Sequence, residues 1–324
     1  MPQLNMFDQP EPLAPQAARL EPRLRAMADA GIRFGTSSWK YPGWIGSIYS
    51  PGRYETRGKF SKAKFEADCL EEYARIFPTV CGDFSFYQFP SSAYWRDLFD
   101  VLPADFRIGL KVPEDITVAV WPKHARYGNK AGLQNEHFLD VGAFKTLFAS
   151  RLKPHADKLG PLIFEFGTFN KQVFPNPTAF IQALDPFLGS LPSGFQYGVE
   201  IRNPEYLTPA YLAMLASHNV AHAYNAWTRM PVLPDQAAIP EADTADFVVV
   251  RAILTRGRTH EEAGKEFEPF DKVRRPDETA RAGIIQIARN ALKLKKPAYV
   301  FVNNPLEGNS PGTIEAVLSA FGDA

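Results

Sequence analysis

The sequence predicts a protein of the α/β class, a (β/α)8 TIM barrel that occupies residues 31–324 as a single domain behind an N-terminal extension. From Arg33 onward, short apolar runs alternate with longer segments of helical periodicity, which is typical of βα units around a parallel sheet. Eight such units in roughly 290 residues fit a barrel, whose usual size is about 250 residues before insertions. An open doubly wound sheet is the alternative, but the G-x-G-x-x-G loop it usually carries is absent after the first run.

The extension, residues 1–30, opens with a stretch that is rich in proline and glutamine and poor in large apolar residues. We expect this opening part to be disordered, because it offers little apolar surface to bury. The segment 14–31, APQAARLEPRLRAMADAG, predicts one short helix that ends at a glycine before the first strand.

The eight expected strands share a high content of apolar residues and lie at 33–37, 79–87, 106–112, 161–167, 195–202, 220–226, 246–252 and 298–304. Helices are expected between and after them, at 59–77, 92–102, 142–160, 176–188, 208–219, 278–295 and 311–321. The segment 227–243 has too many prolines for a long helix. Because the functional face of a barrel lies where its strands end, the carboxyl ends of these strands are the place to search for a site.

The overall composition limits the classes of partner. Lys plus Arg and Asp plus Glu both count 36, so the formal charge is zero, and a nucleic-acid or anionic-membrane partner is not expected. No signal peptide and no apolar run long enough to span a membrane is found, which predicts a cytoplasmic protein. Cys69 and Cys81 have no spacing typical of a disulfide framework or a zinc site, and we expect both to be buried free thiols.

Polar and aromatic side chains gather at the expected strand ends. The loop after the first strand is rich in aromatic residues, including Trp39 and Tyr41, which either pack over the barrel mouth or line a pocket. The other ends carry Asp83, Phe86, Tyr87, Lys111, Glu165, Glu200, Arg202, Tyr224, Arg251, Asn303 and Asn304. A cleft that holds both charge signs suits an anionic or polyhydroxylated small molecule. The alternative is a structural ion-pair network that joins Lys111 to Glu165 and an arginine to Glu200.

Two loops near the expected mouth have two interpretations each. After the eighth strand, we expect one of the paired asparagine amides to hold the loop and the other to meet a ligand or Arg251. Ser310 is expected to cap the last helix, although the free N–H groups there also suit an anion.

After the seventh strand, TRGRTHEE predicts either a capping box between Thr259 and Glu262 or an anion gate made by the arginines beside His260.

Seven motifs, in order, resemble the YecE-like family, catalogued as domain of unknown function 72: RFGTSSWKYPGWIGSIY, GDFSFYQFPS, FRIGLKVPEDIT, LGPLIFEF, YGVEIRNPEYL, VVVRAILTRGRTHEEA and FVNNPLEGNSPGTI. The resemblance implies a TIM barrel without an established activity, in a family sometimes described as related to sugar isomerases. It also implies pocket positions at Trp39, Tyr41, Phe86, Tyr87, Lys111, Glu200, Arg202, Arg251, Asn303 and Asn304. This chain departs from the family pattern where histidines are usual, with Asn203 after the fifth strand, which argues against histidine acid–base chemistry.

Three functional hypotheses follow. The first is an enzyme that acts on a carbohydrate or sugar phosphate without a metal or cofactor. In it Glu200 serves as general base or acid, and Lys111 or Arg251 neutralises developing negative charge. A metal-dependent variant would use carboxylate oxygens that the nearby cations compete for. The second is a small-molecule binding protein without turnover. The third is a nucleic-acid processing protein, which the neutral net charge disfavours.

Overall fold

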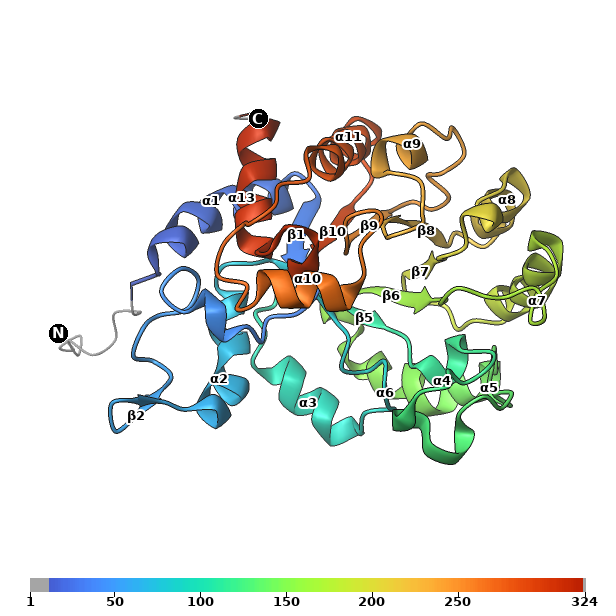
Figure 1. Cartoon of the computed structure of the whole chain (residues 1–324), viewed down its shortest axis with the longest axis horizontal. Coiled ribbons are helices and arrows are strands. Elements are labelled where there is room, and N and C mark those ends of the chain that lie inside the picture. Colours follow the sequence, from blue (N-terminus) through green and yellow to red (C-terminus); the bar gives the residue numbers. More distant parts are fainter. Residues whose placement is uncertain (1–11, 323–324) are drawn as a thin grey trace.

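The computed structural model describes residues 12–322. Eight parallel strands close into a barrel in the order β1–β10–β9–β8–β7–β6–β5–β4 (Figure 1). Their bounds are Ile32–Thr36 (β1), Thr79–Gly82 (β4), Arg107–Lys111 (β5), Leu159–Glu165 (β6), Tyr197–Glu200 (β7), Ala221–Ala226 (β8), Val248–Ala252 (β9) and Ala298–Val302 (β10). The parallel pairing of β1 with β4 closes the ring. The predicted (β/α)8 barrel is therefore confirmed.

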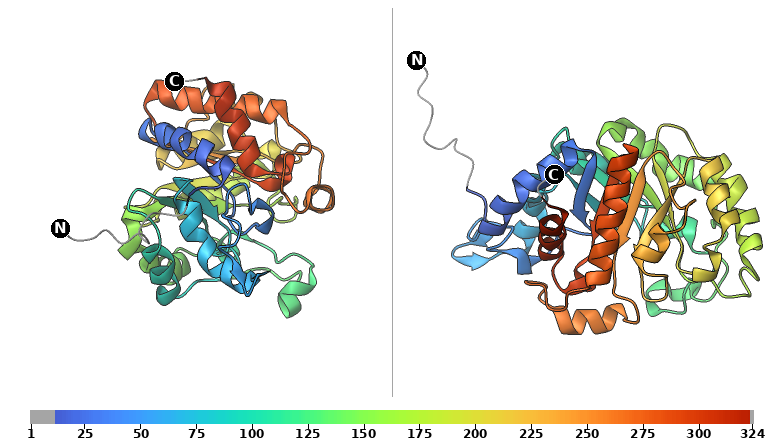
Figure 2. Two further views of the ribbon diagram at one scale, coloured as in Figure 1. Left: turned by 90° about the vertical axis from the view of Figure 1, so that its left-hand side faces the viewer. Right: turned by 90° about the horizontal axis from the view of Figure 1, so that it is seen from above.

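The helices cover the outside of the barrel, as the two further views in Figure 2 show. The longer ones are α1 (Pro15–Asp29), α2 (Lys62–Ala74), α3 (Ser92–Asp100), α7 (Pro177–Gly189), α8 (Pro209–Ser217), α11 (Glu278–Leu294) and α13 (Ser310–Phe321). The shorter ones include α4 (Glu114–Thr117), α9 (Leu233–Ala237), α10 (His260–Phe267) and α12 (Asn304–Glu307). A two-stranded hairpin, β2 (Glu55–Thr56) and β3 (Lys59–Phe60), precedes α2.

Two expected elements differ most from the observed ones. The second strand was expected to continue to residue 87, but it ends at Gly82, and the chain turns so that the Phe86 amide donates to the Asp83 carbonyl at 3.0 Å. Asp and Ser residues favour such turns. The expected helix 142–160 is divided into α5 (Val141–Ala143), a π-helical segment (Phe144–Ala149), α6 (Ser150–Leu152) and a 3-10 segment (Lys153–Lys158). The α-helical part ends before Pro154, which lacks the N–H that an α-helix needs.

Helix α1 corresponds to the short helix expected in the N-terminal extension. Its Leu20 and Leu24 side chains are fully buried, and the Ala17 amide donates to the Ser47 carbonyl at 3.0 Å. The described part of the extension thus packs onto the barrel instead of projecting from it. The opening part expected to be disordered lies in residues 1–11, outside the described residues.

The inside of the barrel has an apolar lower part and a charged upper part. Side chains of alternate strand residues, among them Ile163, Val249 and Phe301, form a buried cluster in the interior. Gly109 makes room for this cluster, because a Cβ at that position would lie 2.8 Å from the Phe301 ring. Two residues further along their strands, where side chains again point inward, Ile163 and Val249 are followed by Glu165 and Arg251.

Cys69 and Cys81 are buried free thiols, as expected. Burial raises the pKa of Cys81 to about 11, although the nearby Arg251 and Lys111 oppose the shift. This thiol therefore stays protonated at neutral pH. Between residues 12 and 322, no helix is long and apolar enough to cross a membrane.

Candidate functional site

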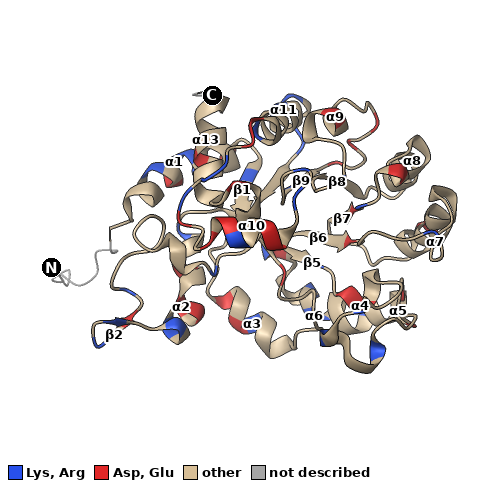
Figure 3. Ribbon diagram, in the orientation of Figure 1, with Lys and Arg blue, Asp and Glu red and all other residues tan. Residues whose placement is uncertain are grey.

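Charged side chains from four strands meet at the carboxyl-terminal mouth of the barrel. Lys111 ends β5, Glu165 ends β6, Glu200 ends β7, and Arg251 is the next-to-last residue of β9. Arg202 follows β7 by two residues, and the β6–β7 register places Glu165 opposite Glu200. Figure 3 shows acidic residues at the ends of β6 and β7. Parallel strands bring these positions together because their carboxyl ends share one face of the barrel.

These five side chains form one ion-pair network. Glu165 accepts from three cations: its Oε2 lies 3.0 Å from Lys111 Nζ and 2.6 Å from Arg251 Nη1, and its Oε1 lies 2.8 Å from Arg202 Nη2. Glu200 accepts from Arg202 Nε at 3.1 Å and also from Arg251 Nη1. The predicted pairs of Lys111 with Glu165 and of the arginines with Glu200 are both present.

The network is almost entirely buried and carries a net positive charge. It holds three cations and two carboxylates, and every one of the five side chains is at most 15% exposed. Burial by itself would raise the pKa of Glu165, but Arg202, Lys111 and Arg251 hold it well below its usual range. Glu165 is therefore ionised at neutral pH and has no proton to give to a ligand.

A cavity of about 390 Å³ opens above this network. Its lining residues come from the loops and strand ends of the mouth: Ser37, Ser38, Tyr41, Asp83, Phe86, Tyr87, Lys111, Glu165, Arg202, Arg251, Ile253, His260 and Asn303. Helix α10, which begins at His260, lies in front of the strands in Figure 1 and at one end of the barrel when seen from above in Figure 2. We call this space the mouth cavity.

Glu200 does not line the mouth cavity, although the sequence favoured it as the general base or acid. Its side chain is 0% exposed, and the two arginines that it binds do line the cavity and cover it. The carboxylate at the cavity wall is Glu165, which ends the neighbouring strand. Glu200 is therefore a positioning residue that holds Arg202 and Arg251.

In the aromatic loop after β1, Trp39 packs in the interior and Tyr41 lines the mouth cavity. Trp39 is buried and packs edge-on against Phe84, with ring centroids 5.8 Å apart, so it lies away from the mouth cavity. Tyr41 lines the cavity, and its ring lies 4.9 Å from that of Trp44 and 5.6 Å from that of Phe270. The expectation that both rings contact the cavity of Lys111 holds for Tyr41 alone.

Tyr224 also lies outside the mouth cavity. Its hydroxyl donates to Asp243 Oδ1 at 2.7 Å, and its ring lies 5.3 Å from that of His222. Ala223 belongs to the cluster inside the barrel, so the side chain of its neighbour Tyr224 points outward toward the helices. Asn225 occupies the inward position that the sequence argument assigned to Tyr224.

The paired asparagines have different roles. Asn303 lines the mouth cavity, whereas the fully buried Asn304 accepts from the Ser310 amide at 2.7 Å and from its hydroxyl at 2.8 Å. Asn304 thus holds the loop before α13. The expectation that Ser310 caps this helix is wrong, because its hydroxyl is bound to Asn304, and Asn309 Oδ1 accepts from the Gly312 amide at 2.7 Å instead.

Two cations of the network lie against aromatic rings. Lys111 Nζ is 3.8 Å from the centre of the Phe86 ring, and Arg202 Cζ is 3.7 Å from that of Trp227. The ring of His260 lies 5.2 Å from the same Trp227 ring. These contacts fix the direction in which the two cations point without using up their hydrogen-bond donors.

Three polar residues that line the mouth cavity were not predicted from the sequence: Ser37, Ser38 and His260. The two serines directly follow β1, and this position at a strand end would have predicted that they lie at the mouth of the barrel. His260 had been noted beside the capping box, and that box is present: the Glu262 amide donates to Thr259 Oγ1 at 3.2 Å and Glu262 Oε2 accepts from the Thr259 amide at 2.8 Å. Burial, and then the charge of Arg202, lowers the pKa of His260.

The arginines beside the capping box do not form an anion gate at the mouth cavity. Arg258 pairs with Glu266, and Arg256 lines a separate cavity with Trp227 and Leu233. Asn203 bonds the backbone of Phe169 through both ends of its amide.

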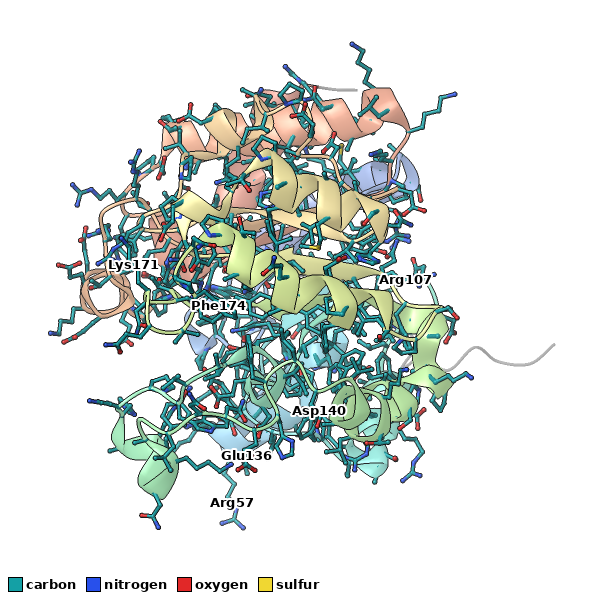
Figure 4. All side chains as sticks on the ribbon, turned by 90° about the vertical axis from the view of Figure 1, so that its right-hand side faces the viewer. Arg57, Arg107, Glu136, Asp140, Lys171 and Phe174 are labelled. Atoms are coloured by element: carbon teal, nitrogen blue, oxygen red, sulfur yellow. The ribbon has the colours of Figure 1, made fainter. Side chains whose placement is uncertain are left out.

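A larger cavity of about 710 Å³ lies between the loops that follow β5 and β6. It is lined by apolar and amide side chains, including Phe138, Asn170, Gln172 and Phe174, and by no charged one. Figure 4 looks onto this side of the molecule and labels Phe174.

Within residues 12–322, no group of three or more His, Cys, Asp or Glu side chains is placed to hold a metal ion. The mouth cavity is therefore the candidate functional site.

Comparison with known proteins places the chain in a family. Residues 33–324 match the family "Protein of unknown function DUF72". The chain is 28% identical over 179 residues to UPF0759 protein YecE of Escherichia coli (strain K12), a match that covers 54% of the chain and spans half, 50%, of that relative's length.

Solved structures of similar fold include a DUF72 family protein from Thermotoga maritima. It has a TM-score of 0.60 and 17% identity, with 90% of this chain and 97% of that chain covered. A second, from Enterococcus faecalis, has a TM-score of 0.58 and 16% identity over 90% and 98% of the two chains. At these identities the likeness concerns the fold, whereas the family match extends over nearly all of the barrel. The chain belongs to the DUF72 family of TIM-barrel proteins.

Proposed function

We propose that this chain binds a small, polyhydroxylated anion of the sugar phosphate or sugar acid class in the mouth cavity. The observation that carries the proposal is the composition of the network below the cavity. Lys111, Arg202 and Arg251 line the cavity together with two carboxylates, Glu165 and Asp83, whereas Glu200 is covered by the arginines. The lining therefore holds one cation more than it holds carboxylates, and its cations offer charged donors to a bound anion.

The remaining lining suits the other parts of such a ligand. Ser37, Ser38 and Asn303 offer hydrogen-bonding groups for hydroxyls, and Tyr41 and Phe86 offer ring faces. Arg251 Nε is buried and has no hydrogen-bond partner within the described part of the chain, which leaves a strong donor unused. A volume of about 390 Å³ matches a small molecule.

Binding is better supported than carboxylate acid–base catalysis. Glu165 is held ionised by three cations, and Glu200 is covered by the arginines. His260 is the group at the cavity whose ordinary pKa lies nearest to neutral, so proton transfer on a bound ligand would fall to it. We therefore rank ligand binding ahead of turnover. His260→Gln distinguishes the two functions, because it should abolish turnover and leave the three cations that bind the anion.

Thermal unfolding with a ligand panel tests the proposal. The panel contains inorganic phosphate, ribose 5-phosphate, gluconate and neutral ribose. A ligand at a hundredfold excess over its dissociation constant stabilises the folded state by about 2.7 kcal/mol, which a melting curve detects. We expect stabilisation by the charged sugars and none by ribose. Equal effects of ribose and ribose 5-phosphate, or no effect of any anion, would overturn the proposal. Mass analysis of the recovered ligand then distinguishes turnover from binding.

A further inference from the structure

We infer that the ligand of the mouth cavity carries a flat ring beside its anionic group, as a nucleoside monophosphate does, and that the ring lies on a ledge formed by Tyr87, Arg126 and Tyr127. The inference rests on the proposed function, which supplies the anionic end. It names the ligand class more narrowly than a sugar phosphate and adds residues outside the cavity lining to the site.

The ledge begins inside the cavity and continues out of it. Tyr87 lines the cavity and is 54% exposed. Arg126 Cζ lies 4.7 Å from the Tyr87 ring centre and 4.5 Å from that of Tyr127. The Tyr127 ring in turn lies 5.4 Å from that of Trp121. The Arg126 guanidinium thus lies against both tyrosine rings at the edge of the cavity, and the buried Trp121 supports Tyr127 from the other end.

A buried carboxylate holds the ledge in place. Glu114 Oε2 accepts from Arg126 Nη2 at 2.8 Å and from the Tyr127 hydroxyl at 2.8 Å. The Glu114 amide donates to the Phe86 carbonyl at 2.7 Å, which ties the ledge to the turn that carries Phe86 and Tyr87. Arg126 is therefore fixed over the Tyr87 ring instead of moving freely in solvent. Such preorganisation lowers the cost of binding a ring against it.

Two adjacent residues connect the ledge to the anion-binding floor. Phe86 lies under Lys111 Nζ at 3.8 Å, and Tyr87 lies under Arg126, with the Phe86 and Tyr87 rings edge to face at 5.3 Å. If the anionic group of the ligand binds Lys111, the rest of the ligand therefore lies next to Tyr87. Aromatic faces and arginine planes are the surfaces on which flat bases stack. A sugar phosphate alone would leave much of this surface uncovered.

Two probes that differ only in the ring test the inference. Ribose 5-phosphate and adenosine 5′-monophosphate share the sugar and the phosphate, so the ratio of their dissociation constants reports the contribution of the base. By isothermal titration calorimetry we expect the nucleotide to bind at least about fivefold more tightly, the lower end of base–aromatic stacking. Tyr87→Ala should bring the ratio close to one. Phe60→Ala removes a comparably exposed ring on the β2–β3 hairpin and should leave the ratio unchanged.

The outcomes separate the inference from the proposed function. Failure of both probes to bind would overturn both. Equal affinities of the two probes would overturn the inference and leave the proposed function standing. A nucleotide preference that persists in Tyr87→Ala would place the ring elsewhere and would also overturn the inference. Melting curves of each variant establish that it is folded before the titrations are compared.

Discussion

Glu200 offers the sharpest test of the charged network as a structural unit. Its carboxylate is 0% exposed and accepts from Arg202 Nε at 3.1 Å and from Arg251. Glu200→Gln keeps the shape of the side chain and removes one negative charge. The buried network would then hold three cations and one carboxylate, Glu165.

The expected cost can be worked out from these contacts. Removing one partner of a buried ion pair typically destabilises a protein by about 3 to 5 kcal/mol, because the other charge is left uncompensated. The amide oxygen introduced by Glu200→Gln would still accept from Arg202, and Arg251 would keep Glu165, so the loss should lie near the lower end, at about 3 kcal/mol. At about 2.1 cal/mol/K per residue, the unfolding entropy of the 324-residue chain is roughly 0.7 kcal/mol/K. The melting temperature should therefore fall by about 4 °C.

Circular dichroism melts of wild type and Glu200→Gln at pH 7 measure this shift. The matched control is Glu136→Gln, since Glu136 is exposed on the side of the molecule shown in Figure 4. It should change the unfolding free energy by less than about 0.5 kcal/mol. If Glu200→Gln melted together with the control, the charge of Glu200 would not be needed to balance the arginines, and our account of the network would be refuted.

Two further predictions concern a buried histidine and the paired asparagines. Burial lowers the pKa of His222 to about 4, below the unfolded value near 6.5, so the wild type should lose roughly 3 kcal/mol of stability as the pH falls between these values. Urea unfolding of His222→Phe should show a much smaller loss over that range, and an equal loss would argue against a neutral buried His222. Asn304→Ala should cost about 1 to 2 kcal/mol, because two bonds to Ser310 are lost. Asn303→Ala should instead weaken ribose 5-phosphate binding with little change in stability; the reverse pattern would contradict our assignment.

Most of the fold was predictable because it depends on local patterns. The alternation of apolar runs with helical periodicity predicted all eight barrel strands. The elements that differ from the prediction do so because of single turn-forming or helix-breaking residues, which the apolar periodicity does not reveal. The alternating aromatic residues after Gly82 resemble a continuing strand, yet Asp83 and Ser85 form a turn there. Pro154 interrupts what otherwise reads as one helix.

The sequence predicted which charged residues meet at the candidate site, but it did not predict which side chains line the mouth cavity. Strand ends of a barrel meet at one face, so the sequence could predict the meeting of Glu200 with the arginines. Whether a side chain reaches the cavity depends on the strand register and on the path of each loop. Tyr224 therefore points outward, and Trp39 packs against Phe84 of the turn after β4. His260 joined the site because α10 lies over the mouth, which no local pattern reveals.

The affinity of the mouth cavity for an anion tests the central claim most directly. Isothermal titration calorimetry of ribose 5-phosphate compares wild type with Lys111→Met, which keeps an unbranched side chain and removes the charge that lies over Phe86. Lys171→Met, at an exposed position labelled in Figure 4, is the control. A hydrogen bond to a charged group contributes about 1.5 to 3 kcal/mol, so we predict binding at least about tenfold weaker in Lys111→Met and unchanged in the control. Equal affinities of Lys111→Met and wild type, or no binding by wild type, would contradict the account.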